Sequence, residues 1–265
     1  MAHVSAGRRG LADIRGVVFD LDGCVWTGEV LTPGAAEVLA LLRAQERRVS
    51  FLTNNSRARA GTLTAKLVRL GVEAADHEVL TPLEILGEVI ATRWGPSRVL
   101  AIGGSELEQA VLDGGHTLVA VEQFKEAAVV VVGNDFGLSY ERLTAAARAV
   151  AAGAHFLTPN IDPRLPLEDG DFLPGCGAIV EAVATAAGVR PVVVGKPEPP
   201  LFELALRRMG LAEREAVMVG DSVDSDVRGA RRVGMMAILF APQGGPDGVA
   251  HYLVRSMAQL KKLLG

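Results

Sequence analysis

Short apolar runs alternate with helical patterns along the whole chain. The first two runs, 17–19 and 49–52, are rich in the β-branched and aromatic residues that favour strands. A helical pattern over about 35–47 lies between them. Strands that alternate with helices in this way predict an α/β fold with a parallel sheet.

A second helical pattern follows the strand at 49–52. Leu63, Leu67 and Leu70 fall on one face of this helix. Ser56 is the expected N-cap, because its side chain can accept a hydrogen bond from a free backbone N–H of the first turn. Gly71 is the expected C-terminal cap, since glycine adopts the left-handed conformation that ends many helices.

The same alternation returns near the C-terminus. It predicts strands at 192–194, 216–219 and 236–240, with helices at about 201–209 and 227–233 between them. Parallel strands joined by right-handed crossovers place their carboxyl ends at one edge of the sheet. Open α/β sheets bind ligands at that edge.

The middle of the chain, 95–189, contains a second set of strands and helices. Its clearest strands are 99–102 and 129–132. The pattern alone leaves open whether this segment continues the first sheet or forms a separate lid.

Polar residues follow four of the predicted strands. The runs at 17–19, 49–52, 192–194 and 216–219 lead into DLDG, TNNS, GKP and GDSVDSD respectively. Asp, Asn and Gly favour turns, so each motif taken alone is compatible with an ordinary loop. Four such motifs at one sheet edge indicate a shared active site instead.

The first and last motifs supply four carboxylates, from Asp20, Asp22, Asp221 and Asp226. Clustered without a counter-charge, they would repel one another strongly. We expect Mg²⁺ as the cofactor, because it prefers oxygen ligands and leaves room for waters and a phosphate. Asp20 can then attack phosphorus as a nucleophile. Asp22, two residues on, is placed to protonate the leaving alkoxide and afterwards to activate water.

The two middle motifs supply groups suited to phosphate. Thr53 offers a hydroxyl, and the amides of Asn54 and Asn55 lie just before a predicted helix N-terminus, which favours phosphate oxygens. Lys196 supplies a point charge for the transition state of phosphoryl transfer. The expected chemistry is removal of phosphate from a small organic phosphomonoester.

The motifs DLDGCVW, FLTNNS, GKPEPPLF and GDSVDSDV resemble, in order and spacing, those of the haloacid dehalogenase (HAD) superfamily. The resemblance implies a Rossmann-like core with a parallel sheet, and a phosphatase that works through an aspartyl phosphate on Asp20. It also implies that Asp20 and Asp221 bind Mg²⁺ through their side chains and Asp22 through its backbone carbonyl. Asp226 would orient a metal-bound water.

The segments VVVGNDFGLSY and TPNIDPRLPLEDGDFLPGCG resemble the NagD-type branch of that superfamily. This branch includes nitrophenyl-phosphatase-like and phosphoglycolate-phosphatase-like enzymes and has a large α/β cap domain. The resemblance therefore implies a catalytic core at 1–94 and 190–265, with a cap inserted at 95–189.

Two features outside the four motifs bear on the site. The cap loop offers Asn160, Asp162 and Arg164 as contacts to the substrate's non-phosphate part, although its prolines also fit a structural turn. Cys24 stands where the family more often has threonine or valine. We interpret it as a packing variant, because Asp20 already fills the nucleophile role.

Composition and charge narrow the range of partners. The net charge is −4 and no basic stripe is present, which argues against a nucleic-acid partner. No apolar run approaches the roughly 20 residues that cross a bilayer, and residues 1–10 lack the apolar segment of a secretory signal. The two cysteines and five histidines show no disulfide or zinc spacing. We expect a cytoplasmic monomer or homodimer whose partner is a small-molecule phosphate ester.

Two other functions use the same residue types. A phosphotransferase or phosphomutase would pass the phosphoryl group from Asp20 to a hydroxyl instead of water. A phospho-receiver module would also cluster aspartates beside Thr and Lys, but it needs neither Asp22 nor a cap. The sequence does not select among phosphoglycolate, glycerol phosphate, pyridoxal phosphate, sugar phosphates and nucleoside monophosphates.

Overall fold

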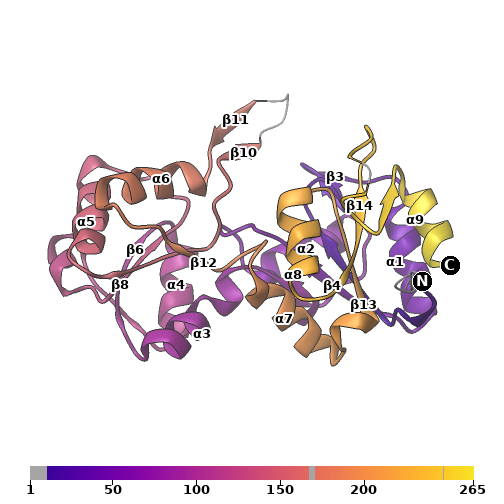
Figure 1. Cartoon of the computed structure of the whole chain (residues 1–265), viewed down its shortest axis with the longest axis horizontal. Helices are drawn as coiled ribbons and strands as arrows, with labels where there is room; N and C mark the ends of the chain where they lie inside the picture. Colours follow the sequence, from indigo (N-terminus) through magenta and orange to yellow (C-terminus); the bar gives the residue numbers. More distant parts are fainter. Residues whose placement is uncertain (1–10, 167–170, 247) are drawn as a thin grey trace, which may run out of the picture.

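The computed structural model describes residues 11–166, 171–246 and 248–265. The chain forms two lobes side by side along the long axis of the molecule, each built on its own parallel sheet (Figure 1). Both faces of each sheet carry helices. The α/β class expected from the sequence is therefore confirmed.

The first lobe contains a six-stranded sheet in the order β15-β14-β13-β1-β4-β5. All five neighbouring pairs in this sheet are parallel. The strands are β1 (Gly16–Asp20), β4 (Arg48–Leu52), β5 (Val79–Leu80), β13 (Ala216–Gly220), β14 (Met236–Phe240) and β15 (Tyr252–Val254).

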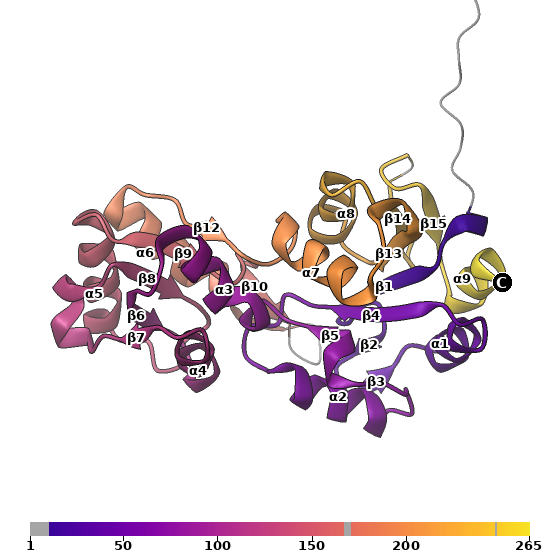
Figure 2. The same ribbon diagram turned by 90° about the horizontal axis from the view of Figure 1, so that it is seen from below.

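Alternate residues of these strands face two separate apolar layers. Val17 and Phe19 of β1 pack in the layer formed with α1 (Ala35–Ala44), α2 (Ala60–Arg69) and α9 (Met257–Leu264). Val18 packs in the opposite layer, formed with α7 (Pro199–Met209) and α8 (Arg228–Arg232). Figure 2 shows α7 and α8 on one side of the strands and α1 and α2 on the other. Burial on both faces explains why these strands are nearly continuous apolar runs.

The second lobe contains a five-stranded parallel sheet in the order β12-β9-β8-β6-β7. Helices α5 and α6 cover one face, and α3 and α4 lie in the apolar layer of the other. The strands are β6 (Arg98–Ile102), β7 (Thr117–Leu118), β8 (Val129–Val132), β9 (His155–Thr158) and β12 (Val192–Val193), and the helices are α3 (Leu83–Trp94), α4 (Ser105–Asp113), α5 (Tyr140–Ala151) and α6 (Cys176–Ala187). The middle segment therefore has a sheet of its own and does not extend the first sheet.

Short elements complete the described chain. Two hairpins pair β2 (Trp26–Thr27) with β3 (Val30–Leu31), and β10 (Arg164–Pro166) with β11 (Phe172–Pro174). The remaining helical turns are η1 (Leu11–Asp13), η2 (Asp76–Glu78), η3 (Val121–Glu126), η5 (Glu213–Glu215) and the π-helical turn η6 (Val223–Val227). No helix within the described ranges is long and apolar enough to cross a membrane.

The start of α2 differs from the prediction. The helix begins at Ala60 and its N-cap is Arg59, so the expected N-cap at Ser56 is wrong. Asn55 explains the delay, because its Oδ1 accepts hydrogen bonds from the backbone N–H groups of Arg57 and Ala58 and holds a turn there. The expected C-terminal cap is present, since Gly71 has a φ of 88°.

The lobe boundaries also differ in detail. The strand at 192–194 was expected in the core sheet, but β12 pairs with β9 in the second sheet. Helix α3, also expected in the core, packs against α4, where a Cβ on Gly87 would lie 2.5 Å from Gly114 Cα. The division into core and cap stays a prediction, and on these contacts the second lobe begins near 83 and ends near 193.

Candidate active site

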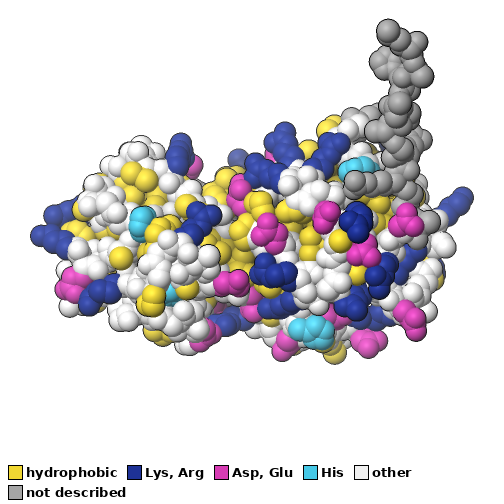
Figure 3. Space-filling view, turned by 60° about the horizontal axis from the view of Figure 1, so that its bottom comes forward, with side chains coloured by type: hydrophobic (Ala, Val, Ile, Leu, Met, Phe, Trp, Pro, Cys, Tyr) yellow, Lys and Arg dark blue, Asp and Glu magenta, His cyan; other side chains and the backbone are white. Residues whose placement is uncertain are grey.

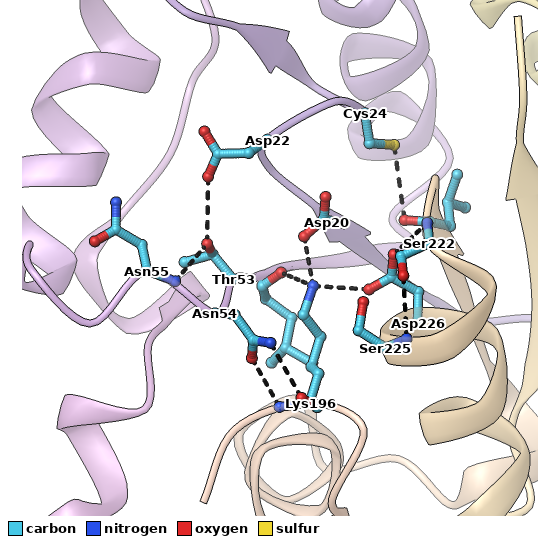
Figure 4. A network of polar contacts seen from close by, with 12 residues as sticks. Asp20, Asp22, Cys24, Thr53, Asn54, Asn55, Lys196, Ser222, Ser225 and Asp226 are labelled. Atoms are coloured by element: carbon cyan, nitrogen blue, oxygen red, sulfur yellow. Dashed lines mark hydrogen bonds and ion pairs between the residues drawn. The ribbon is translucent and has the colours of Figure 1, made fainter. Parts of the chain in front are cut away.

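Three of the four motifs meet at the carboxyl edge of the first sheet. β1 ends at Asp20 and lies between β4, which leads into Thr53, and β13, which leads into Asp221. The register pairs Asp20 with Leu52, so the ends of β1 and β4 are level. In Figure 4, Asp20 and Asp226 point toward one spot, whereas Asp22 turns toward Thr53.

Lys196 completes this group from the segment after β12. Its Nζ donates to Asp20 Oδ1 at 2.5 Å, to Asp226 Oδ1 at 2.7 Å and to the Leu52 carbonyl oxygen at 3.2 Å. The side chain is only 3% exposed. Burial lowers the pKa of Lys196, but the charges of Asp20 and Asp226 outweigh burial and raise it above the usual value. The ammonium group therefore stays protonated between two buried carboxylates.

Asp20, Asp221 and Asp226 form a carboxylate cluster. Each offers one oxygen, and these oxygens lie within 4.8 Å of one another. Burial raises the pKa of Asp20 well above its ordinary value; Lys196 opposes this shift, and the charges of Asp226 and Asp221 add to it. Burial and Asp226 raise the pKa of Asp221 to about 6. Three carboxylates thus share one buried ammonium, and the excess negative charge suits a divalent cation.

Two glycines allow the carboxylates to approach the backbone this closely. Gly23 has a φ of 85°, and a Cβ there would lie 2.3 Å from Asp221 Oδ2. A Cβ on Gly220 would lie 2.2 Å from Asp226 Oδ2. The same Asp226 oxygen accepts a hydrogen bond from the Ser222 N–H at 3.0 Å. Any larger residue at these two positions would displace a carboxylate of the cluster.

Asp22 lies beside the cluster and faces Thr53 (Figure 4). Its Oδ1 accepts a hydrogen bond from the indole Nε1 of Trp26 at 2.8 Å, and its Oδ2 lies 3.5 Å from Thr53 Oγ1. Unlike Asp20, Asp22 is exposed. The two aspartates of the first motif therefore occupy different environments, one buried against Lys196 and one open to solvent.

Asn54 and Asn160 join the two lobes next to this site. The Asn54 side chain accepts from the Lys196 N–H at 2.8 Å and donates to the Lys196 carbonyl at 3.0 Å (Figure 4). Asn160 follows β9 and donates to the Asn54 carbonyl at 2.7 Å and to Ser56 Oγ at 3.3 Å. These contacts fix the backbone that carries Lys196 relative to the end of β4.

Comparison with known proteins identifies the family. A family model described as haloacid dehalogenase-like hydrolase matches residues 17–117, and a second HAD-like hydrolase model matches residues 193–244. An acid sugar phosphatase of Staphylococcus epidermidis is 34% identical over 221 residues, covering 83% of this chain and 84% of the relative. The chain belongs to the haloacid dehalogenase-like hydrolases.

Solved structures of this hydrolase family share the whole architecture. A 4-nitrophenylphosphatase from Thermotoga maritima superposes with a TM-score of 0.86 at 28% identity, covering 96% of this chain and 99% of the other. A glycerol phosphate phosphatase from Mycobacterium tuberculosis in complex with magnesium superposes with a TM-score of 0.84 at 32% identity, covering 95% and 78% respectively. The two-lobed fold expected from the resemblance is thus confirmed.

In this HAD hydrolase the side chains of Asn54 and Asn55 have structural partners. Both polar groups of the Asn54 side chain bond the Lys196 backbone, and Asn55 Oδ1 holds the turn before α2. The Asn55 N–H donates to Thr53 Oγ1 at 3.0 Å. The phosphate contacts expected from Thr53, Asn54 and Asn55 remain predictions.

Asn160, Asp162 and Arg164, in the loop predicted to belong to the cap of this hydrolase, lie in three different environments. Asn160 is 4% exposed, and its side-chain amide bonds the Asn54 carbonyl across the two lobes, while its expected substrate contact stays a prediction. Asp162 is exposed, yet partial burial raises its pKa, while Lys196 and the Asn54 amide lower it, so its carboxylate lies near the site. The Arg164 guanidinium stacks 4.1 Å from the centre of the Phe172 ring in the β10-β11 hairpin. Asp162 is therefore the best placed of the three for a substrate contact.

Cys24 of this hydrolase is a buried thiol. Its Sγ lies 3.7 Å from the Val219 carbonyl. Burial, reinforced by the negative charge of Asp20, raises the pKa of Cys24 well above its ordinary value. The thiol therefore stays protonated, which agrees with the interpretation of Cys24 as a packing residue.

Sequence reasoning missed three contacts within the site. It gave Trp26 no polar role, although the indole bonds Asp22. It also missed the Leu52 carbonyl that accepts from Lys196 and the Ser222 N–H that bonds Asp226. The two backbone groups leave no signal in the sequence. The contact between Trp26 and Asp22 could have been inferred, because Gly23 between them favours a turn that brings the two side chains together.

Proposed function

We propose that this hydrolase removes phosphate from a small organic phosphomonoester, with Mg²⁺ as its cofactor and Asp20 as its nucleophile. Lys196 carries this proposal, because it is a buried ammonium bonded to both Asp20 and Asp226 beside Asp221. One cation among three carboxylates is suited to binding a metal and a phosphate together. A phosphatase is among the similar proteins both when sequences are compared and when structures are compared.

The proposed reaction has two displacements at phosphorus. A carboxylate oxygen of Asp20 attacks phosphorus, and the bond from phosphorus to the substrate oxygen breaks. Asp22 donates its proton to that departing oxygen. Water then attacks the phosphorus of the aspartyl phosphate while Asp22 takes up a proton, and the bond to Asp20 breaks. Inorganic phosphate leaves and the carboxylate is restored.

The carboxylate cluster fits Mg²⁺. Hard oxygen donors are the ligands this ion prefers, and the cluster carries more negative charge than Lys196 neutralises. Asp20 and Asp221 would hold the ion through their side chains, Asp22 through its carbonyl, and Asp226 through a water. The ion supplies charge neutralisation at the phosphoryl oxygens. Lys196 would supply positive charge to the same oxygens from the protein, and its charge opposes the rise in the pKa of Asp20 that burial causes.

Sugar phosphates and glycerol phosphate are the proposed substrates. The acid sugar phosphatase and the glycerol phosphate phosphatase are both similar over most of this chain. The test is phosphate release from a panel of phosphomonoesters with Mg²⁺ and no added acceptor. Release from glycerol 3-phosphate or a sugar phosphate is expected. Consumption of the ester only when an acceptor alcohol is added, with the phosphoryl group recovered on that alcohol and no free phosphate, would contradict hydrolysis and indicate a phosphotransferase.

Magnesium dependence should vary with pH. Chelator is expected to abolish activity and added Mg²⁺ to restore it. The pKa of Asp221 is raised to about 6, so protons compete with the metal for this carboxylate below that pH. The half-saturating Mg²⁺ concentration should therefore rise by up to about tenfold per unit of pH below 6. A titration of activity with Mg²⁺ at several pH values measures this. An unchanged Mg²⁺ requirement from pH 8 to pH 5 would count against Asp221 as a ligand.

Substitution of Asp22 should affect substrates according to their leaving groups. Glycerol is a poor leaving group and needs a proton, whereas nitrophenolate leaves without one. Asp22→Asn should lower kcat/KM for glycerol 3-phosphate by about 10²-fold or more and for 4-nitrophenyl phosphate much less. The measurement is kcat/KM on both substrates with Mg²⁺. An equal loss on both would show that Asp22 is not the acid.

The cap carboxylate should influence selectivity. Asp162 is exposed near Lys196 and Asn54, so a bound polyol can reach it. Asp162→Ala should lower kcat/KM by about tenfold for substrates with a hydroxyl at that position and spare 4-nitrophenyl phosphate. Glu181→Ala is the matched control, because Glu181 is an exposed carboxylate of the same lobe paired with Arg190. A uniform loss on every substrate would assign Asp162 a structural role only.

A further inference from the structure

Trp26 is a buried tryptophan whose indole N–H donates a hydrogen bond to an exposed carboxylate. Its side chain is 1% exposed, and its Nε1 donates to Asp22 Oδ1 at 2.8 Å. An indole N–H can donate but cannot accept a hydrogen bond. Asp22 Oδ1 must therefore be the acceptor in this contact, whatever the protonation state of Asp22.

The loop between these residues holds the indole in place. The Gly23 N–H donates to the Trp26 carbonyl at 2.8 Å, and the Trp26 N–H donates to the Leu21 carbonyl at 3.0 Å. Lys66 Nζ lies 4.3 Å from the centre of the indole ring and also bonds the Gly28 carbonyl at 2.8 Å. The backbone bonds fix the ring's position, and the cation on its face restrains its plane.

The second carboxylate oxygen has a different neighbour. Asp22 Oδ2 accepts only a long hydrogen bond, at 3.5 Å, from Thr53 Oγ1, which itself accepts the Asn55 N–H at 3.0 Å. Thr53 is a residue of the proposed phosphate site, so Oδ2 is the oxygen on the substrate side. The two oxygens of Asp22 are therefore not equivalent.

We propose that Trp26 is a positioning residue for the acid/base carboxylate. By occupying Oδ1, its N–H keeps the exchangeable proton of Asp22 on Oδ2, facing the substrate oxygen. In the forward step Oδ2–H gives this proton to the departing oxygen, and in the second step Oδ2 takes one from water. This inference rests on the proposed function, because it requires Asp22 to act as the leaving-group acid.

The test compares the chain's two tryptophans. Trp26→Phe keeps an aromatic ring and removes the N–H, and it should lower kcat/KM for glycerol 3-phosphate by about tenfold or more. The value for 4-nitrophenyl phosphate should change by less than about threefold, since nitrophenolate needs no proton. Trp94→Phe is the matched control; Trp94 stacks on His155 in the other lobe, and its loss should leave the ratio of the two substrates unchanged. An equal loss on both substrates in Trp26→Phe would overturn the inference.

A double-mutant cycle separates positioning from packing. If Trp26 acts through Asp22, then Trp26→Phe should have no further effect on glycerol 3-phosphate in the Asp22→Asn background. A full additional loss there would show that Trp26 acts through packing. If Asp22→Asn alone shows no leaving-group dependence, the proposed role of Asp22 fails as well. If only the Trp26→Phe result fails, the proposed function stands.

A measurement on the intact tryptophan keeps the inference testable if Trp26→Phe does not fold. The two indole N–H groups give two proton resonances, which Trp94→Phe assigns. The Trp26 resonance should move upfield in Asp22→Ala, because the hydrogen bond to the carboxylate is lost. A Trp26 resonance that stays in place would overturn the contact on which the inference depends.

Discussion

We expect Lys196→Met to lower kcat/KM by about 10³-fold on every substrate, whatever its leaving group. Lys196 is the buried cation between Asp20 and Asp226, and its partners lie at 2.5 and 2.7 Å. Its charge acts on the phosphoryl group, which all substrates share. Methionine keeps the length and apolar stem of the side chain but removes that charge. Steady-state kinetics on glycerol 3-phosphate and 4-nitrophenyl phosphate measure the effect.

The same substitution should destabilise the metal-free protein. Removing one partner of a buried ion pair costs about 3–5 kcal/mol, because the remaining carboxylates stay buried without a counter-charge. Added Mg²⁺ should recover part of this stability by neutralising Asp20 and Asp221. Lys261→Met on the exposed end of α9 is the matched control and should change neither activity nor stability. A loss of activity confined to one substrate would place Lys196 in a specificity pocket instead.

Asp20→Asn should abolish turnover, with a loss of about 10⁴-fold or more, because the amide cannot attack phosphorus. The fold should be kept. Burial, with Asp226 and Asp221 nearby, raises the pKa of Asp20 well above its ordinary value. A carboxyl group whose pKa is higher in the folded than in the unfolded protein stabilises the fold at low pH, where it is protonated. This contribution to the free energy of unfolding is lost as the pH rises through the folded-state pKa. The metal-free Asp20→Asn variant should therefore be more stable than the wild type at alkaline pH, and the difference should shrink as the pH falls.

Asp224→Asn provides the control for that prediction. Asp224 is a carboxylate of the last motif, but it is exposed and paired with Arg228. Its substitution should leave turnover intact. Thermal unfolding at pH 5 and pH 9 without metal measures the stability effect. Residual turnover of Asp20→Asn within about tenfold of the wild type would exclude Asp20 as the nucleophile.

The elements of the fold were predictable where the periodicity was strong. Strand ends carrying Asp20, Thr53 and Asp221 could be placed at one edge, because parallel strands joined by helices leave little choice. The carboxylates of the predicted metal site, Asp20, Asp221 and Asp226, do lie together. The local residue pattern and the topology determine these features, so they can be predicted from a single sequence.

Features that depend on contacts between the lobes were not predictable. The short run at Val192–Val193 fits either sheet by composition, and only its pairing with β9 assigns it to the second. Asn160 reads as a polar loop residue suited to a substrate, but it is buried against Asn54. Ser56 is a good cap by residue type, yet the turn held by Asn55 delays the helix. For Val192–Val193 and Asn160 the partner lies outside the window in which a periodicity or propensity can be read, whereas the turn held by Asn55 is local and the residue types alone allow either cap.

The electrostatic properties of the site also come from packing. Four aspartates in two motifs predict repulsion, but not which of them is buried. Asp20 and Asp226 are buried against Lys196, while Asp22 stays exposed and bonds Trp26. This difference in burial distinguishes Asp20, the proposed nucleophile, from Asp22, the proposed acid, within one three-residue motif.

The central claim is that phosphate passes first to Asp20 and only then to water, and stereochemistry at phosphorus tests it most directly. A phosphorothioate monoester made chiral with one heavy oxygen isotope is hydrolysed in water enriched with another, and the configuration of the released thiophosphate is determined. Each in-line displacement inverts phosphorus, so two displacements predict overall retention of configuration. Overall inversion would mean that water attacks the substrate directly and would contradict the aspartyl-phosphate intermediate.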